Sequence, residues 1–278
     1  MVLDVLLDTL LDALKMAPIL YLAYLLMEVL EHHAGEKMNQ AIAKVGKAGP
    51  LLGAALGVVP QCGFSGAIAG FYAGGVATLG TLIAVFMSTS DEMLPLMISE
   101  GAQAGVLFKL LLAKFAAGLV FGYLVDFVFH GHTEMHIEEI CEQDHCDCES
   151  HNVWASAGIH CLKVMGVILI VTFLLNLAFE LGGADFFSRL LPDVPVLSEL
   201  IAALIGLVPS CSASVLLTEL YLNDVIHAGA LIAGLSANAG VGLVVLFRQH
   251  RHMFGNFKIT GLLYVCSVVA GVLLGLMF

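Results

Sequence analysis

Charged residues are scarce in this chain of 278 residues, where Asp, Glu, Lys and Arg together make up 12% of the sequence. Soluble domains average about 25% charged and 45–50% apolar residues, whereas this chain is 59% hydrophobic and has a mean hydropathy of +0.96. It therefore lacks the polar surface that a soluble globule needs. Apolar stretches of the roughly 20 residues that a membrane-spanning helix requires recur along the chain. The composition predicts an all-α, polytopic membrane protein.

Several functional signatures are missing as well. Lys and Arg form no basic patch interleaved with aromatic residues, so nothing indicates nucleic-acid binding. The G-x-x-x-x-G-K-[ST] motif is absent, which argues against ATP hydrolysis within this chain. The cysteines number seven, and an odd count argues against a full disulfide framework. Residues 1–14 lack the basic start of a cleaved signal peptide, and they predict an amphipathic helix that lies at the membrane interface or extends the first span.

Two short polar motifs interrupt the apolar stretches and repeat each other 149 positions apart. They read GVVPQCGFS over 57–65 and GLVPSCSAS over 206–214. Proline removes a backbone donor and breaks a helix, and in hydrocarbon the freed carbonyl groups need new partners. Broken helices at matching positions of two halves are typical of a substrate site between the repeats of a transporter.

The similarity at this offset extends beyond the two motifs. The alignment without gaps also pairs Glu31 with Glu180, Gly80 with Gly229, and Gly122 with Gly271. Coincident Pro, Cys and Gly residues are not expected by chance, so the pattern predicts a duplication. We predict a first transmembrane repeat over 1–129, a linker over 130–156 and a second repeat over 157–278.

Each half is predicted to hold four apolar stretches. These are a first helix (16–30; 162–181), a broken segment (50–74; 197–222), a third stretch (76–100; 225–247) and a final helix (103–129; 257–278). The third stretch is itself interrupted, by STSDE over 88–92 and by SANAG over 236–240. If the third stretch is one span, each half has four helices, and if it is split at the interruption, each half has five. Only an odd number of helices per half would invert the second repeat in the membrane. The distribution of Lys and Arg does not decide between these counts.

The interruptions supply most of the polar groups within the predicted spans. An ionisable group at membrane depth costs at least ~2.5–3.5 kcal/mol, so Asp91 and Glu92 are expected to face a partner, a cation or water. The alternative is that Ser90 or Asp91 caps a helix in a short exposed turn. The candidate substrate-binding residues are Pro60, Gln61, Cys62, Ser65, Ser88, Ser90, Asp91, Glu92, Pro209, Ser210, Cys211, Ser212, Ser214, Ser236 and Asn238.

A second polar cluster lies at the end of the first predicted helix. Glu28, Glu31 and His32 share one helix face, and Glu180 repeats the second of them in the other half. The cluster could bind a metal ion during entry or exit, or accept a proton. Alternatively, it is the ordinary polar end of the span, and the same interpretations apply to Asp126. An embedded metalloenzyme is less favoured because HExxH is absent. We predict no catalytic residues.

The linker is rich in potential metal ligands. Residues 130–151 read HGHTEMHIEEICEQDHCDCESH, without Lys or Arg. Imidazole and thiolate groups suit zinc, copper and other soft or borderline metals, although a solvated acidic connector is the alternative. The candidate ligands are His130, His132, His136, Cys141, His145, Cys146, Cys148 and His151.

The VPQCGFS and VPSCSAS motifs, the STSDE break answered by SANAG, and the His-rich linker resemble the family of ten-transmembrane heavy-metal exporters. Its members are also labelled arsenic efflux proteins or manganese transporters. The resemblance covers essentially the whole chain, and it implies ten helices in two inverted five-helix repeats. It also implies metal or metalloid efflux across the cytoplasmic membrane of a bacterium, with the linker on the cytoplasmic side.

Ligand chemistry favours a Mn²⁺-like divalent cation over arsenite. A single Cys in each break fits a three-thiolate arsenite site poorly, whereas the oxygen ligands of Asp91 and Glu92 suit a harder ion. We therefore predict a secondary transporter that exports this ion by proton-coupled alternating access. Its partners are the bilayer and the ion, and no cofactor is expected beyond a metal held by the linker. An organic-solute or organoarsenical permease is the alternative.

Overall fold

The computed structural model describes residues 48–59, 62–90, 93–129, 196–250 and 253–277, with scattered residues between 9 and 25 and between 154 and 174. All regular elements in these ranges are α-helices. Four helical stretches are long and apolar enough to cross a membrane, namely 79–99, 104–129, 228–249 and 253–275. Ala48–Gly57, Leu197–Gly206 and Cys211–Leu222 are shorter apolar helices. The prediction of an all-α, polytopic membrane protein is confirmed.

The helices follow the same order in both halves. In the first half, the helix Ala48–Gly57 precedes α3 (Cys62–Ala73), α4 (Leu79–Ser88), α5 (Met93–Ser99) and α6 (Ala104–Phe129). In the second half, α10 (Leu197–Gly206) precedes α11 (Cys211–Leu222), α12 (Ala228–Ala237), α13 (Val241–Gln249) and α14 (Met253–Gly275). The predicted breaks are present in both halves, within the second segment and within the third stretch.

The described helix boundaries lie within three residues of their predictions, except at the start of the last helix. The last helix begins at Met253 rather than at Phe257. The reason is Asn256, which is fully buried and whose Nδ2 donates to the carbonyl of His250 at 3.1 Å. This contact ties the first turn of α14 to the end of α13. The first predicted helix of each half lies largely outside the described residues, as does the amphipathic segment 1–14.

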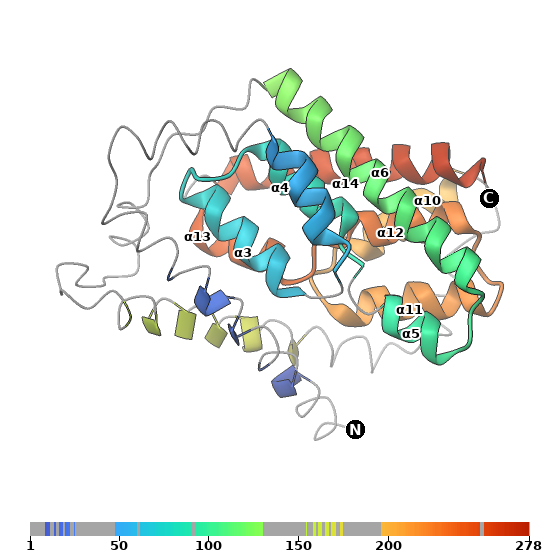
Figure 1. Ribbon diagram of the computed structural model, residues 1–278, viewed down its shortest axis with the longest axis horizontal. Helices are drawn as coiled ribbons and strands as arrows, with labels where there is room; N and C mark the ends of the chain where they lie inside the picture. Colours follow the sequence, from blue (N-terminus) through green and yellow to red (C-terminus); the bar gives the residue numbers. More distant parts are fainter. Residues whose placement is uncertain are drawn as a thin grey trace.

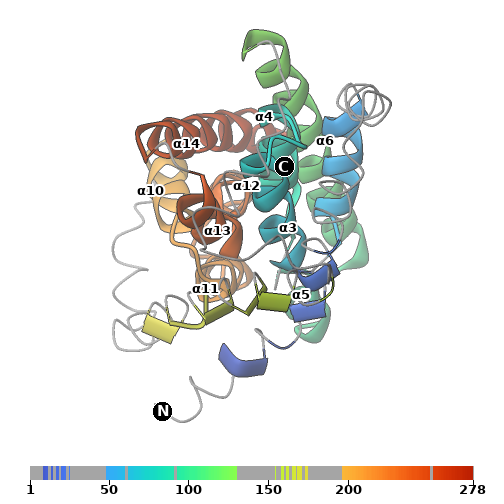
Figure 2. The same cartoon turned by 90° about the vertical axis from the view of Figure 1, so that its left-hand side faces the viewer.

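Close helix pairs form the body of each half. Gly122 of α6 packs on Gly80 and Ala84 of α4, and the residues at the same offset, Gly271, Gly229 and Ala233, make the same contacts between α14 and α12. Small residues let helix backbones approach closely, which is how helices associate in membranes. The two halves lie side by side, with α3 to α6 on one side of the molecule and α10 to α14 on the other (Figure 2).

The halves also exchange short helices. Helix α13 packs against α3, and α5 packs against α11, so each half contributes the helix after its break to the other half. These two pairs lie at opposite ends of the molecule (Figure 1). Helices α4 and α12 meet between them.

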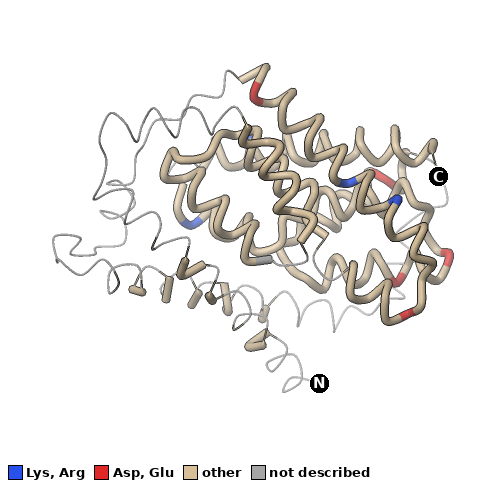
Figure 3. Tube along the Cα trace, viewed as in Figure 1, with Lys and Arg blue, Asp and Glu red and all other residues tan. Residues whose placement is uncertain are grey.

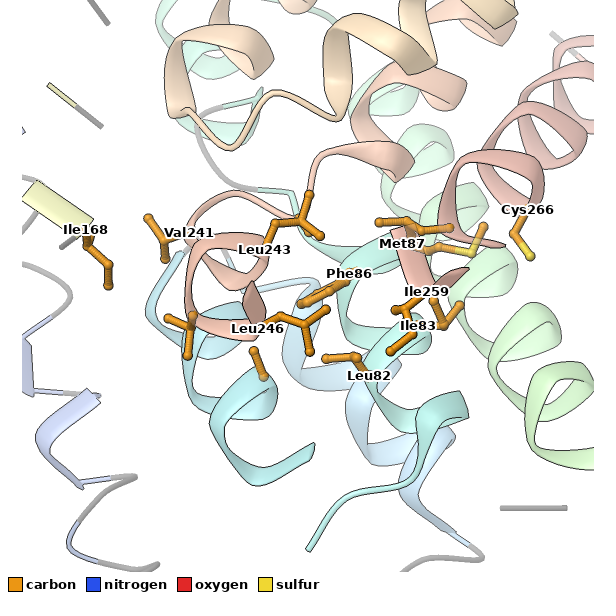
Figure 4. Packing of buried hydrophobic residues seen from close by; sticks show 14 of the residues in the cluster. Leu82, Ile83, Phe86, Met87, Ile168, Val241, Leu243, Leu246, Ile259 and Cys266 are labelled. Atoms are coloured by element: carbon orange, nitrogen blue, oxygen red, sulfur yellow. The ribbon is translucent and has the colours of Figure 1, made fainter. Parts of the chain in front are cut away.

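Burial separates central helices from peripheral ones. The stretch 228–249 is 89% buried and 79–99 is 75% buried, whereas 104–129 is 22% and 253–275 is 33% buried. The peripheral helices therefore present apolar surface to lipid, and charged residues are few and scattered along the described chain (Figure 3). The central helices share one apolar core, in which Leu82 and Phe86 of α4 pack with Val241 and Leu246 of α13 (Figure 4).

Candidate functional site

In the first half, the two helix breaks meet. The hydroxyl of Ser90 donates to the carbonyl of Val58 at 2.7 Å, and its backbone N–H donates to the carbonyl of Gly57 at 3.3 Å. A helix that ends at Gly57 cannot supply the usual backbone donors to these carbonyl groups. In hydrocarbon they must therefore accept hydrogen bonds from elsewhere in the protein. The Ser90 hydroxyl thus joins the two breaks.

The second half joins its breaks through an amide. Ser210 caps α11 by accepting the N–H of Ser212 at 3.1 Å. Asn238 reaches back to this turn, with Nδ2 at 3.5 Å from the carbonyl of Ser210, while its Oδ1 accepts the N–H of Gly240 at 2.9 Å. A φ of 51° at Gly240 reverses the chain into α13, a conformation that glycine adopts without strain. Asn238 therefore links both breaks of this half.

The breaks of one half lie against the other half. A Cβ added to Gly242, at the start of α13, would lie 2.8 Å from the carbonyl of Ser65 and 2.6 Å from the ring of Phe86. Cys211 is a buried, reduced thiol in the same apolar cluster as Phe86 and Ala239. The polar breaks are thus assembled from both halves, inside the most buried part of the described chain.

The buried hydroxyls at these breaks point their protons at the backbone. Ser88 donates to the carbonyl of Ala84, Thr89 to that of Val85, and Ser214 to that of Cys211, each at 2.7 Å. A hydroxyl has one donor and two acceptor lone pairs, so the oxygen atoms keep acceptor capacity after these bonds. Ser236 is fully buried, and its Oγ has no hydrogen-bond partner among the described residues. The Ser88, Thr89 and Ser214 oxygens can therefore accept from, or coordinate, a ligand, whereas the Ser236 hydroxyl can also donate.

The remaining predicted residues divide into two groups. Pro209 and Ser212 are half-buried in the turn before α11 and in its first residues. Cys62 begins α3 by its backbone, and its side chain lies outside the described part. Also outside the described residues are Pro60, Gln61, Asp91, Glu92, Glu28, Glu31, His32, Glu180 and the linker residues His130, His132, His136, Cys141, His145, Cys146, Cys148 and His151.

Lys114 is a site residue that the sequence reading missed. It is fully buried although it lies inside the apolar helix α6. Gly118, one turn further along the same face, packs on Ser88, and Leu110, one turn before, shares a cluster with Met93. Lys114 is therefore level with the break between α4 and α5. An ionisable residue within an apolar span was the available signal.

Asp126, which allowed two interpretations, has a structural role. Its Oδ1 accepts the N–H of Gly80 at 2.7 Å, and its Oδ2 accepts the hydroxyl of Thr78 at 2.7 Å. Thr78 in turn caps α4 by accepting the N–H of Thr81 at 3.1 Å. A carboxylate near a helix N-terminus is stabilising, so Asp126 fastens α6 to the start of α4.

A different carboxylate occupies the same place in the second half. Glu199 of α10 approaches the start of α12, where His227 takes the position of Thr78. His227 Nδ1 accepts the N–H of Ala230 at 3.3 Å, and its Nε2 lies 3.8 Å from Glu199 Oε1. Glu199 is 4% exposed, and its Oε2 has no hydrogen-bond partner among the described residues. Sequence reasoning missed this pair because the two residues are far apart along the chain.

Within the described ranges, no three His, Cys, Asp or Glu side chains gather closely enough to hold a metal ion. A cavity of about 360 Å³ lies between residues of the first predicted helices, among them Tyr21, Cys161 and Met165. Its lining is apolar, and it is separate from the helix breaks.

Residues 2–183 match a protein family described as "Putative, 10TM heavy-metal exporter". The match covers more than half of the chain and includes the first pair of helix breaks. Searches among curated proteins and among solved structures found no match. With its apolar spans and interrupted helices, this chain belongs to that family of membrane heavy-metal exporters.

Proposed function

We propose that this protein exports a divalent transition-metal ion of the Mn²⁺ type across the cytoplasmic membrane of a bacterium. The observation that best supports a cation is the orientation of the buried hydroxyls. Those of Ser88, Thr89 and Ser214 donate to backbone carbonyls, so their oxygen lone pairs remain for a ligand. Hard or borderline divalent ions prefer such oxygen ligands.

The proposed binding site draws on both halves. Within the described part it contains Ser65, Ser88, Ser90, Ser210, Cys211, Ser214, Ser236 and Asn238, with Pro209 and Ser212 in the adjoining turn. The same motifs add Pro60, Gln61, Cys62, Asp91 and Glu92. The two carboxylates would supply charge, and the hydroxyls and the Asn238 amide would supply neutral oxygens. The cysteines would bias the site toward a transition metal over Mg²⁺ or Ca²⁺.

Lys114 fits this site as a resident positive charge. It is fully buried and level with the break that carries both carboxylates. Two carboxylates and one ammonium leave a net negative charge, which favours a cation over an oxyanion. A buried charge is tolerated in a membrane only where it faces the protein interior or a cavity, so Lys114 is expected to face the site. Because its ammonium group repels a cation, it would also limit how tightly the ion is held.

Transport would follow alternating access of two inverted five-helix repeats. The equivalent contacts of Gly122 and Gly271, and the exchange of α5 and α13 between the halves, support two related units. Breaks in both units support a site where such repeats meet. We propose proton antiport as the driving reaction, with Asp91 or Glu92 releasing a proton as the metal binds. The linker would gather metal on the cytoplasmic side, and Glu28, Glu31, His32 and Glu180 would serve uptake, release or proton transfer.

Metal uptake into everted membrane vesicles tests this proposal. Vesicles that contain the protein are expected to accumulate ⁵⁴Mn²⁺ above vesicles that lack it, and a protonophore should abolish the accumulation. Parallel assays with Zn²⁺, Co²⁺, Cu²⁺, Fe²⁺ and arsenite rank the substrates. Accumulation of arsenite alone, or of none of these ions, would overturn the proposal in favour of a metalloid or organic-solute permease. Uptake that persists without a pH gradient would exclude proton antiport.

A further inference from the structure

The first turns of α14 carry an exposed face of mixed chemistry. Phe257 and Lys258 lie three and four residues after Phe254, so the three side chains share one side of the helix. Phe254 is 75% exposed and Phe257 is 63% exposed, and Lys258 is exposed as well. The Lys258 ammonium lies 4.8 Å from the centre of the Phe254 ring, which is a cation–π contact. An apolar ring and a cation are therefore presented together at the end of a membrane-spanning helix.

The end of α13 adjoins this face and adds positive charge. Phe257 packs edge-on against Phe247, with the ring centres 5.3 Å apart, so the two helices are joined here. The next residue, Arg248, is exposed and lies in the last turn of α13. Arg251 follows in the sequence, and residues 248–258 contain no acidic residue. The corner where α13 ends and α14 begins is thus basic.

The corresponding corner of the first half, where α5 ends and α6 begins, differs in two ways. Its exposed lysine, Lys109, aligns with Lys258 at the 149-residue offset. Gly105 stands one turn before this lysine, where the second half has an exposed ring. The stretch 99–109 also contains Glu100, so its charges cancel. The excess of positive charge is therefore specific to the second half.

The two corners lie at opposite ends of the molecule, and hence at opposite membrane surfaces (Figure 1). Lys and Arg are in excess on the cytoplasmic side of membrane proteins, which assigns the α13–α14 corner to that side. An anionic lipid surface attracts cations that lie next to a membrane span. We propose that this corner binds the headgroup of an anionic phospholipid in the cytoplasmic leaflet.

The chemistry of the corner matches both parts of such a lipid. The phosphate would lie beside Lys258, with Arg248 as a second cation, because long basic side chains reach from an apolar surface to the charged headgroups. The exposed rings of Phe254 and Phe257 would contact the first carbons of the acyl chains. Helix α13 also packs on α3 of the other half, so the lipid would steady a helix that joins the halves. This inference does not rest on metal transport.

Photolabelling tests the site on the full-length protein in phosphatidylcholine nanodiscs. The probe is phosphatidylglycerol with a diazirine near the start of one acyl chain, and mass spectrometry identifies the labelled peptides. The same diazirine on phosphatidylcholine measures non-specific contact with lipid. We expect the phosphatidylglycerol probe to be enriched at 247–258 over this background, and unlabelled phosphatidylglycerol should displace it.

Matched variants of the two lysines sharpen the test. Lys258→Gln should lower the enrichment about five-fold, which is the loss expected for one cation at an anionic surface. Lys258→Arg keeps the charge and should keep the enrichment. Lys109→Gln, the same change at the other corner, should have no effect. Added phosphatidylglycerol should also raise the thermal unfolding temperature in detergent, and it should do so less in Lys258→Gln than in Lys109→Gln.

The outcomes decide the inference separately from the transport proposal. Equal labelling of 247–258 by both probes, or unchanged enrichment in Lys258→Gln, would overturn the lipid site. Equal enrichment at 99–109 would also overturn it, because that corner lacks the excess charge. Displacement of the probe by an equal concentration of inorganic phosphate would indicate a site for free phosphate instead. Enrichment that depends on Lys258 would support the site even if vesicles accumulate no metal.

Discussion

The two carboxylates at the starts of α4 and α12 occupy the same place in the two halves but come from different helices. Asp126 lies on α6, which follows α4 in the chain, and it contacts Gly80 at the start of α4. Glu199 lies on α10, which precedes α12 in the chain, and it contacts His227 at the start of α12. At the 149-residue offset, Asp126 corresponds to Gly275, and Glu199 corresponds to Pro50. Each of these two helix N-termini thus has a carboxylate beside it, supplied by residues that do not correspond at this offset.

The partners of the two carboxylates differ in chemistry. Thr78 donates its hydroxyl to Asp126, and together with the N–H of Gly80 it satisfies both carboxylate oxygens. His227 instead places an imidazole beside Glu199 and leaves one oxygen without a partner among the described residues. One half therefore satisfies both carboxylate oxygens and fastens two helices, whereas the other leaves one oxygen unsatisfied among the described residues. The following predictions test this division, from the largest expected effect to the smallest.

The first prediction concerns the glycines beneath the two carboxylates. In Gly80→Ala, the new Cβ would collide with the carbonyl of Gly122 and with Asp126, so we expect a loss of about 3 kcal/mol in stability. In Gly229→Ala, the Cβ would lie 2.9 Å from the carbonyl of Gly271, and the cost should be about 1–2 kcal/mol. Thermal unfolding in detergent, followed by size-exclusion chromatography, measures both. A larger loss in Gly229→Ala would contradict the tighter packing of the first half.

The second prediction concerns the carboxylates themselves. Asp126→Leu removes two hydrogen bonds to a charged group and should lower the free energy of unfolding by about 2 kcal/mol. Glu199→Leu removes a buried carboxylate whose partner His227 can be solvated, so stability should stay the same or rise. The same unfolding assay checks the opposite signs. Equal destabilisation by both changes would show that Glu199 is as structural as Asp126.

The third prediction concerns Lys114, whose equivalent in the second half is Leu263, and both residues are fully buried. Lys114→Leu makes the first half resemble the second, and we expect metal uptake into vesicles to fall at least ~10-fold. Stability should be unchanged or higher because a buried charge is removed. Normal uptake by a well-folded Lys114→Leu protein would remove this residue from the site.

The fourth prediction transfers the first-half cap to the second half. Thr is a good helix cap, as Thr78 shows at α4, so His227→Thr should change stability by less than about 0.5 kcal/mol. The unfolding assay of the first prediction measures this change. Ser198→Ala, a change at a buried residue beside Glu199, controls for general disturbance of α10. A loss of more than about 1 kcal/mol in His227→Thr would contradict equivalent capping by the two residues.

Hydrophobic runs and their interruptions were readable from the sequence because they depend on local chemistry. Apolar segments must be helical in hydrocarbon, since helices satisfy their own backbone groups. The breaks after Gly57, Ser88, Gly206 and Ala237 follow from Pro, Gly, Ser and Asn at those places. The family was also correctly inferred from the paired motifs.

Contacts between distant segments were not readable from the sequence. Lys114 looked like one charge in a long apolar helix, and its place beside the break depends on how α6 packs along α4. The replacement of Asp126 by Glu199 breaks the 149-residue correspondence, so no alignment of the halves could reveal it. Only the packed structure shows that these carboxylates lie at equivalent helix starts. The reason is that a charge can stabilise a helix N-terminus from any helix that packs beside it.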